Sequence, residues 1–194
     1  MRAIGIAAAC LSALLLPGCS TTSAPPAQSQ LHFDGPPIRL DVARIEVVTE
    51  YTMPLKAPNV EHLMPIPLAA AAKRWAEERL QPTGNARVAR VVIQDGSVVQ
   101  TPLKKTEGVK GFFTDDQEAR YDARLAVTLA ILDDRAAGLG TAAAEATRSR
   151  TINEKATLND RDKLYYEITD QLVREIDQAL QKQIAANLAR YVLN

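Results

Sequence analysis

The chain has 194 residues and a mass of 21.1 kDa, which is room for one domain. Hydrophobic residues make up 46% of it and charged residues 24%, a balance that is typical of a globular protein and excludes disorder over the whole chain. The 23 basic and 23 acidic side chains cancel, whereas a dedicated nucleic-acid-binding protein has a basic excess, so we expect no nucleic-acid partner.

The chain begins with the pattern of an export signal. Arg2 supplies a positive charge, and an apolar run follows from Ala3 to Leu16. As a helix this run would be about 21 Å long, which is short of the roughly 30 Å hydrocarbon core of a membrane. The pattern therefore predicts a signal peptide over residues 1–18 rather than a transmembrane helix.

The end of this signal, Leu16-Pro17-Gly18-Cys19, resembles a bacterial lipobox. The resemblance implies cleavage before Cys19 and acylation of its thiol with chains such as palmitate, which would anchor the protein in a membrane. Because Ser20 follows the cysteine, the same resemblance implies an outer-membrane location that faces the periplasm. The alternative is an ordinary cleaved signal peptide in which the cysteine has no role.

Residues 19–37 predict a lipidated cysteine followed by a flexible tether. Serine, threonine, alanine, proline and glutamine dominate this stretch and cannot form a core. Its last residues, Pro36-Pro37, favour an extended chain. We therefore expect a single folded domain over residues 38–194.

The first part of that domain predicts a strand, a helix and a second strand. Apolar residues alternate over residues 38–42 and then shift phase by one position over residues 45–47. Such a shift indicates either a bulge or a strand that is buried on both faces. Helical spacing of apolar residues predicts a helix over residues 67–80, ended by Pro82-Thr83-Gly84, and residues 87–94 have the valine and isoleucine content of a strand.

The next segments predict further strands. Asp95-Gly96 is either a tight hairpin turn or a bulge in one long strand, and we favour the bulge because Thr101-Pro102 soon ends the following run. Strict alternation over residues 120–131 predicts a strand with one buried face, which is typical of an antiparallel sheet. Residues 141–152 fit a helix or a return strand, and we favour the strand.

The chain closes with a long predicted helix. Thr157 or Asn159 is its expected N-cap, and leucine and isoleucine recur every four residues over residues 164–188. The expected element order is β-α-β-β-β-α. This order predicts an α+β fold, with an antiparallel sheet of about four strands and two helices packed on one face.

The last turns of this helix have two interpretations. A row of residues spaced by four drifts about 40° per step around an ideal helix, so the end of the row points away from its beginning. Ile184, Leu188 and Tyr191 therefore either pack on the domain because the helix curves, or offer an apolar surface to a partner.

Motifs for catalysis or metal binding are missing from the sequence. It contains no P-loop, GxSxG or HExxH motif. His32 falls in the tether and His62 in a proline-rich loop, and neither has a second ligand at metal spacing. Residues 138–143 match the loose dinucleotide pattern GxGxxA, but without the βαβ context that this motif needs. We predict a protein that is not an enzyme and has no cofactor and no metal site.

One loop is a candidate contact surface. Lys104, Lys105 and Lys110 lie close in sequence to Phe112 and Phe113. Basic side chains beside aromatic rings suit anionic lipid or lipopolysaccharide. The alternative is a solvated loop whose phenylalanines fold back onto the core. With the end of the last helix, this loop forms the predicted binding surface.

The lipidated cysteine, the tether and the β-α-β-β-β-α order over about residues 38–190 resemble two groups of bacterial lipoproteins. One is the LptE-like lipoproteins of lipopolysaccharide assembly, and the other is the PqiC-like auxiliary lipoproteins of ABC-type lipid transport. The resemblance rests on element order. It implies a non-enzymatic accessory component of an outer-membrane assembly or a lipid/ABC transport system, which binds an envelope protein or a lipid. The alternatives are a structural or peptidoglycan-associated lipoprotein and a hydrolase with an unrecognised site.

Overall fold

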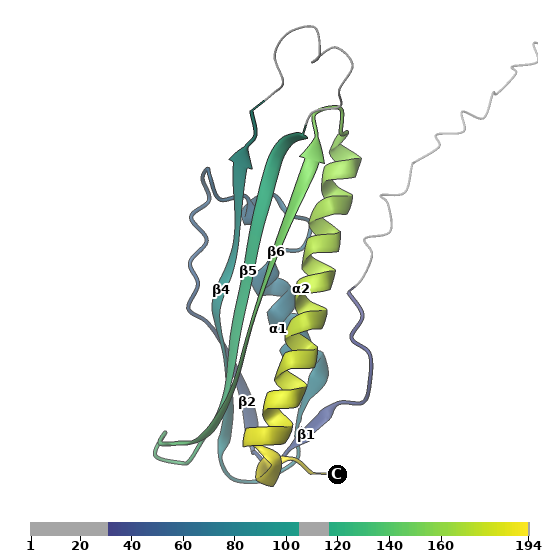
Figure 1. The fold of residues 1–194 in the computed structure, drawn as a ribbon. Helices are drawn as coiled ribbons and strands as arrows, with labels where there is room; N and C mark the ends of the chain where they lie inside the picture. The colour runs from purple at the N-terminus through teal and green to yellow at the C-terminus, as the bar shows by residue number, and fades with distance from the viewer. Residues whose placement is uncertain (1–30, 105–116, 194) are drawn as a thin grey trace, which may run out of the picture. The chain divides into compact units, whose positions relative to one another are not determined.

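The computed structural model describes residues 31–104 and 117–193, and the chain from Leu31 onward forms one compact unit. The described residues form two sheets and two α-helices (Figure 1). The larger sheet has the strand order β2-β4-β5-β6 and the smaller one pairs β1 with β3. The elements are β1 (Ile38–Leu40), β2 (Arg44–Thr49), α1 (Leu68–Arg79), β3 (Leu80–Pro82), β4 (Val88–Pro102), β5 (Gln117–Leu132), β6 (Gly138–Asn153) and α2 (Leu158–Asn187), with 3-10 turns at Glu61–Leu63 and Ala189–Tyr191.

The α+β fold and several of its predicted elements are confirmed. The alternating residues of β5 point their apolar side chains into the core, where α1 and α2 cover the sheet. β6 is the return strand, in antiparallel pairing with β5. The N-cap of α2 is Thr157, whose side chain accepts a hydrogen bond from the Asp160 amide at 3.2 Å, while Asp160 Oδ2 accepts one from the Thr157 amide at 2.9 Å. This reciprocal pair is a capping box.

Asp95-Gly96 lies inside one long strand, as we favoured, and the bulge falls at the preceding residue, Gln94. β4 continues to Pro102, and its register with β5 shifts between Ile93 and Asp95. A Cβ atom on Gly96 would lie 3.1 Å from the backbone nitrogen of Ala69 in α1. The bulge therefore brings α1 and β4 together where only a small residue fits.

The expectation of a purely antiparallel sheet is wrong at one strand. β2 pairs in parallel with β4, from Arg44 opposite Val88 to Thr49 opposite Ile93. The chain between them passes through α1 and returns to the same end of the sheet, and a crossover of this kind makes the two strands parallel. The sheet is therefore mixed.

The phase shift after residue 42 marks neither a bulge nor a strand buried on both faces. It is the place where the chain leaves the small sheet at Leu40 and enters the large sheet at Arg44. The first predicted strand is thus two strands. The first helix also ends earlier than expected, because Leu80 begins β3, which pairs in parallel with β1.

The folded unit begins earlier than Ile38. Leu31 is 1% exposed and belongs to the core, and Phe33 packs against that core. We call residues 31–36 the strap. The part of the predicted tether that forms the strap is therefore part of the domain.

Candidate functional site

Most of the predicted contact loop, and the predicted lipidation site, lie outside the described residues. They are Cys19, Lys105, Lys110, Phe112 and Phe113. Lys104 is described and exposed, two residues beyond the end of β4. The strands that flank this loop in sequence, β4 and β5, extend over 15 and 16 residues and form a long antiparallel ladder.

The three apolar residues predicted as a possible partner surface at the end of the last helix are buried in the domain. Ile184 is 3% exposed, Leu188 0% and Tyr191 6%. The helix ends at Asn187, and a 3-10 turn then directs the chain back onto the domain. The turn returns Tyr191 to the core, whereas Ile184 is still inside α2, whose four-spaced row is already buried from Ile168 onward.

The C-terminal residues are held by backbone and aromatic contacts. The Tyr191 carbonyl accepts a hydrogen bond from the Asp41 amide at 2.8 Å, and Val192 forms an antiparallel bridge with Leu40. The guanidinium carbons of Arg190 and Arg87 lie 4.8 Å and 5.4 Å from the centre of the Tyr191 ring, which is the geometry of a cation–π interaction. The chain end thus extends the small sheet.

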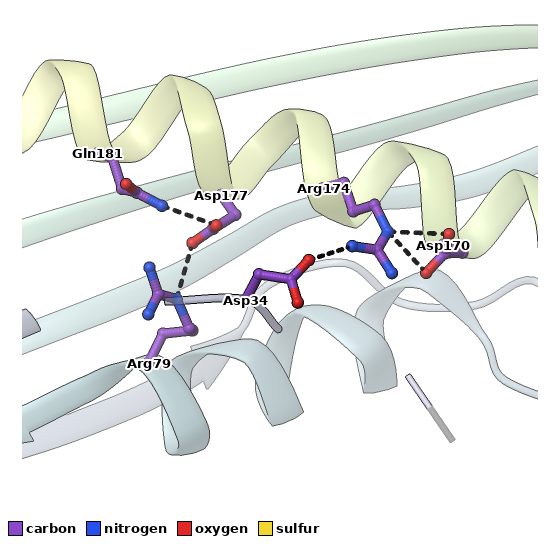
Figure 2. Close-up of polar contacts among 6 residues, drawn as sticks. All are labelled: Asp34, Arg79, Asp170, Arg174, Asp177 and Gln181. Atoms are coloured by element: carbon purple, nitrogen blue, oxygen red, sulfur yellow. Dashed lines mark hydrogen bonds and ion pairs between the residues drawn. The ribbon is translucent and has the colours of Figure 1, made fainter. Parts of the chain in front are cut away.

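A buried polar cluster joins α1 to α2. Asp177 Oδ1 accepts hydrogen bonds from Trp75 Nε1 at 2.8 Å and from Arg79 Nε at 3.1 Å. Asp177 Oδ2 accepts one from Gln181 Nε2 at 2.7 Å (Figure 2). The Arg79 side chain is 4% exposed and the Asp177 side chain 13%, so this is a buried ion pair. Its hydrogen bonds offset the cost of taking both charges out of water.

The same arginine holds the strap. Arg79 Nη1 donates a hydrogen bond to the carbonyl oxygen of Pro36. Gly35 has a φ of +94°, a backbone conformation that glycine adopts without strain, and a Cβ atom there would lie 3.5 Å from the guanidinium of Arg79. The strap therefore passes directly over the buried ion pair.

A second, exposed ion pair holds the strap about one helical turn before Asp177 in α2. Arg174 Nη1 donates to Asp34 Oδ2 at 2.8 Å, while its Nε donates to both carboxylate oxygens of Asp170, at 3.1 and 3.0 Å (Figure 2). The hydrogen bonds that Arg174 donates to Asp170 are the main cause that raises the pKa of Arg174 above its ordinary value. A cavity of about 220 Å³ lies between this pair and the Asp177 cluster.

A buried carboxylate, Glu61, fixes the long loop before α1. It is 0% exposed, and its Oε2 accepts a hydrogen bond from the Val98 amide of β4 at 3.2 Å. Tyr51 Oη donates to Oε1, and Asn59 Nδ2 lies 3.3 Å from both carboxylate oxygens. Burial, and next the hydrogen bond to Glu61, raise the pKa of Tyr51 above its ordinary value. These contacts attach the loop to the sheet.

A shallow groove lies at the end of α2. It has a volume of about 420 Å³ and is lined mainly by apolar side chains, among them Ile38, Ile184 and Val192, together with Gln181. Within residues 31–104 and 117–193, no group of three or more His, Cys, Asp or Glu side chains could hold a metal ion. No helix among the described residues is long and apolar enough to cross a membrane.

Comparison with known proteins gives only distant similarities. No protein-family model matches the chain, and no curated protein matches it. The structure is similar to a minor lipoprotein from Acinetobacter baumannii, with 17% identity and a TM-score of 0.39 over 80% of this chain and 98% of that one. It is also similar to a Caulobacter crescentus CB15 protein assigned as a lipoprotein, with 14% identity and a TM-score of 0.39 over 73% and 88%. A Xanthomonas campestris protein matches with 6% identity and a TM-score of 0.33 over 78% and 88%. Similarity at this level assigns neither a family nor a function to the chain.

Proposed function

We propose that this chain is a lipid-anchored protein of the bacterial cell envelope that acts by binding and not by catalysis. In this proposal it is an accessory component of an outer-membrane assembly or of a lipid/ABC transport system. The observation that carries the proposal is the lipobox-like Leu16-Pro17-Gly18-Cys19 at the end of an apolar signal. Several acyl chains on Cys19 would anchor the domain firmly, whereas a single chain binds a membrane only marginally.

The structure supports a binding role through the way it carries the predicted contact loop. Lys104 is exposed, and the loop that follows it joins β4 and β5, whose ladder extends from Val88 opposite Leu132 to Pro102 opposite Ala119. Loops that connect elements of a regular scaffold are frequent binding sites. The proposed partner is an envelope protein or an anionic lipid such as lipopolysaccharide.

The anchor is tested by labelling cells with radioactive palmitate. The wild-type chain should incorporate the label, and Cys19→Ala should lose it, because the acylated thiol is then missing. An inhibitor of signal peptidase II should make the unprocessed precursor accumulate. A chain that is cleaved but carries no label would be an ordinary secreted protein and would contradict the anchor.

The binding surface is tested in the double variant Phe112→Ser, Phe113→Ser. It should lose the complex that the wild-type protein forms in detergent extracts, while its thermal unfolding stays unchanged. The matched control is Leu63→Ser, which removes an exposed leucine (59% exposed) elsewhere on the domain and should keep the complex. Wild-type binding by the double variant would contradict the proposed surface. Co-sedimentation with peptidoglycan, without any protein or lipid partner, would favour the structural alternative.

A further inference from the structure

We infer that the strap, residues 31–36, is a fixed attachment that shortens the tether, so that only the chain between Cys19 and Leu31 sets how far the domain can move from the membrane. This inference rests on the lipid anchor proposed above. It adds a limit on the distance at which a partner can be reached.

The strap is held at each of its ends and near its middle. Leu31 is among the largest fully buried side chains of the domain, and Phe33 packs against the core. Asp34 pairs with Arg174 of α2, and the Pro36 carbonyl accepts a hydrogen bond from Arg79 of α1.

The two arginines that hold the strap are also held by carboxylates of α2. Arg79 is already oriented by Asp177, and Arg174 by Asp170. Their guanidinium groups therefore lose little additional freedom when they bind the strap. After the strap the chain enters β1, which pairs with β3 in the small sheet.

The attachment changes the reach of the tether. An extended chain spans at most about 3.5 Å per residue. The stretch from Cys19 to Leu31 can therefore span at most about 40 Å, whereas a tether that ran to Ile38 could span about 65 Å.

The place where the strap is attached determines which parts of the domain the tether allows to reach the membrane. The strap contacts α2 at Arg174 and α1 at Arg79, whose partner Asp177 lies in the middle part of α2. A helix of 30 residues is about 45 Å long, so each end of α2 lies within about 25 Å of this point. The tether thus lets either end of α2 reach the membrane surface. It holds the attachment point within about 40 Å of that surface, and an end of α2 that points away from the membrane can lie about 25 Å further out.

The test compares two neighbouring variants of the full acylated protein in detergent. Leu31→Ser removes a buried side chain, and the control His32→Ser changes the exposed residue beside it. Chymotrypsin cleavage after Phe33 measures release of the strap, because cleavage follows the population of the open segment. We expect Leu31→Ser to accelerate this cleavage about tenfold or more and His32→Ser to leave it unchanged. Arg174→Gln should accelerate it about two- to fivefold, because it removes only an exposed ion pair.

The reach itself is measured on vesicles. Trp75 is the only tryptophan of the chain, so energy transfer from it to dansyl-labelled lipid headgroups reports the distance of the domain from the membrane. Leu31→Ser should lower this transfer relative to the wild type and to His32→Ser. Circular dichroism identifies any variant that does not fold, and Leu31→Ala, a milder truncation of the same buried side chain, gives the same comparison if Leu31→Ser is unfolded.

Two results would overturn the inference. One is equally fast cleavage after Phe33 in the wild type and in the folded variants, since the strap would then be free already. The other is energy transfer that does not change when the strap is released. Loss of the palmitate label from the wild-type chain is a separate result: it would contradict the anchor, and the cleavage experiment in detergent would still report whether the strap is docked.

Discussion

Removal of the Asp177 carboxylate should be one of the most destabilising single changes in the domain. In Asp177→Ala the Arg79 guanidinium stays buried, with its side chain only 4% exposed, but loses its counter-charge. Trp75 Nε1, in a side chain that is 0% exposed, loses its acceptor at the same time. Breaking a buried pair from one side costs about 3–5 kcal/mol of unfolding free energy. That is a large share of the roughly 5–15 kcal/mol that holds a typical domain together.

Urea unfolding measures this loss, and Trp75 fluorescence reports directly on the cluster. With a slope of about 2 kcal/mol per molar urea, the midpoint of Asp177→Ala should fall by about 2 M. The control on α1 is Glu77→Ala, which breaks the exposed Lys73–Glu77 pair (3.9 Å, 60% and 58% exposed) and should cost at most about 0.5 kcal/mol.

A double variant separates the unpaired charge from the loss of packing. Replacing both partners, as Arg79→Met with Asp177→Leu, should recover much of the lost stability, because apolar residues of similar size often replace a buried pair without cost. If Asp177→Ala shifts the midpoint no more than Glu77→Ala does, the buried pair does not hold α1 to α2 as argued.

Two further changes test the close packing and the capping of the fold. Gly84→Ala should lower the free energy of unfolding, measured in urea, by about 1–3 kcal/mol, because its Cβ would collide with Asp41 Oδ1 and lie 2.7 Å from the backbone carbon of Asp41. The control Gly138→Ala, with nothing within 4 Å of its Cβ, should leave the free energy of unfolding unchanged. Equal effects of the two substitutions would refute the packing argument. Thr157→Ala should cost about 1 kcal/mol through loss of the cap of α2, and no change would contradict the capping box. The hydrogen bonds from the Thr157 side chain and amide lower the pKa of Asp160 below its ordinary 3.8, so its contribution to stability is present above that pH and is lost as the pH falls through the folded-state pKa. The difference in unfolding midpoint between the wild type and Asp160→Asn should accordingly shrink below about pH 4, and a difference independent of pH would exclude this origin.

The sequence predicts those parts of the fold that depend on local pattern. The alternation of β5 and the spacing of apolar residues in α1 and α2 repeat along each element, so a short window shows them. The direction of β2 does not follow from such a window, because it depends on the path of the chain through α1 to a partner strand that starts at Val88. The break between β1 and β2 changes the phase of the pattern in the same way as a bulge does.

The buried cluster around Asp177 and the strap show a second limit of prediction from the sequence: contacts between residues that lie far apart in the chain. Trp75 and Arg79 are separated by 102 and 98 residues from Asp177, so their contact depends on how α1 packs on α2. A local signal was nevertheless present, because Arg79 follows Trp75 by one helical turn and so lies on the apolar face of α1. A charge in that position indicates a buried partner. Leu31 and Phe33 gave a weaker signal: they are more apolar than the rest of the tether, but two apolar residues before Gly35-Pro36-Pro37 do not show that the segment packs on the core.

The measurement that tests the central claim most directly is crosslinking in living cells of the tagged full-length protein, followed by purification in detergent and identification of what co-purifies. The proposed accessory role predicts a specific envelope partner, such as an outer-membrane barrel or a component of a lipid or ABC transport system. That partner should be lost in Phe112→Ser, Phe113→Ser. Recovery of no specific partner, or of peptidoglycan fragments alone, would contradict the accessory role and would leave a structural lipoprotein as the better account.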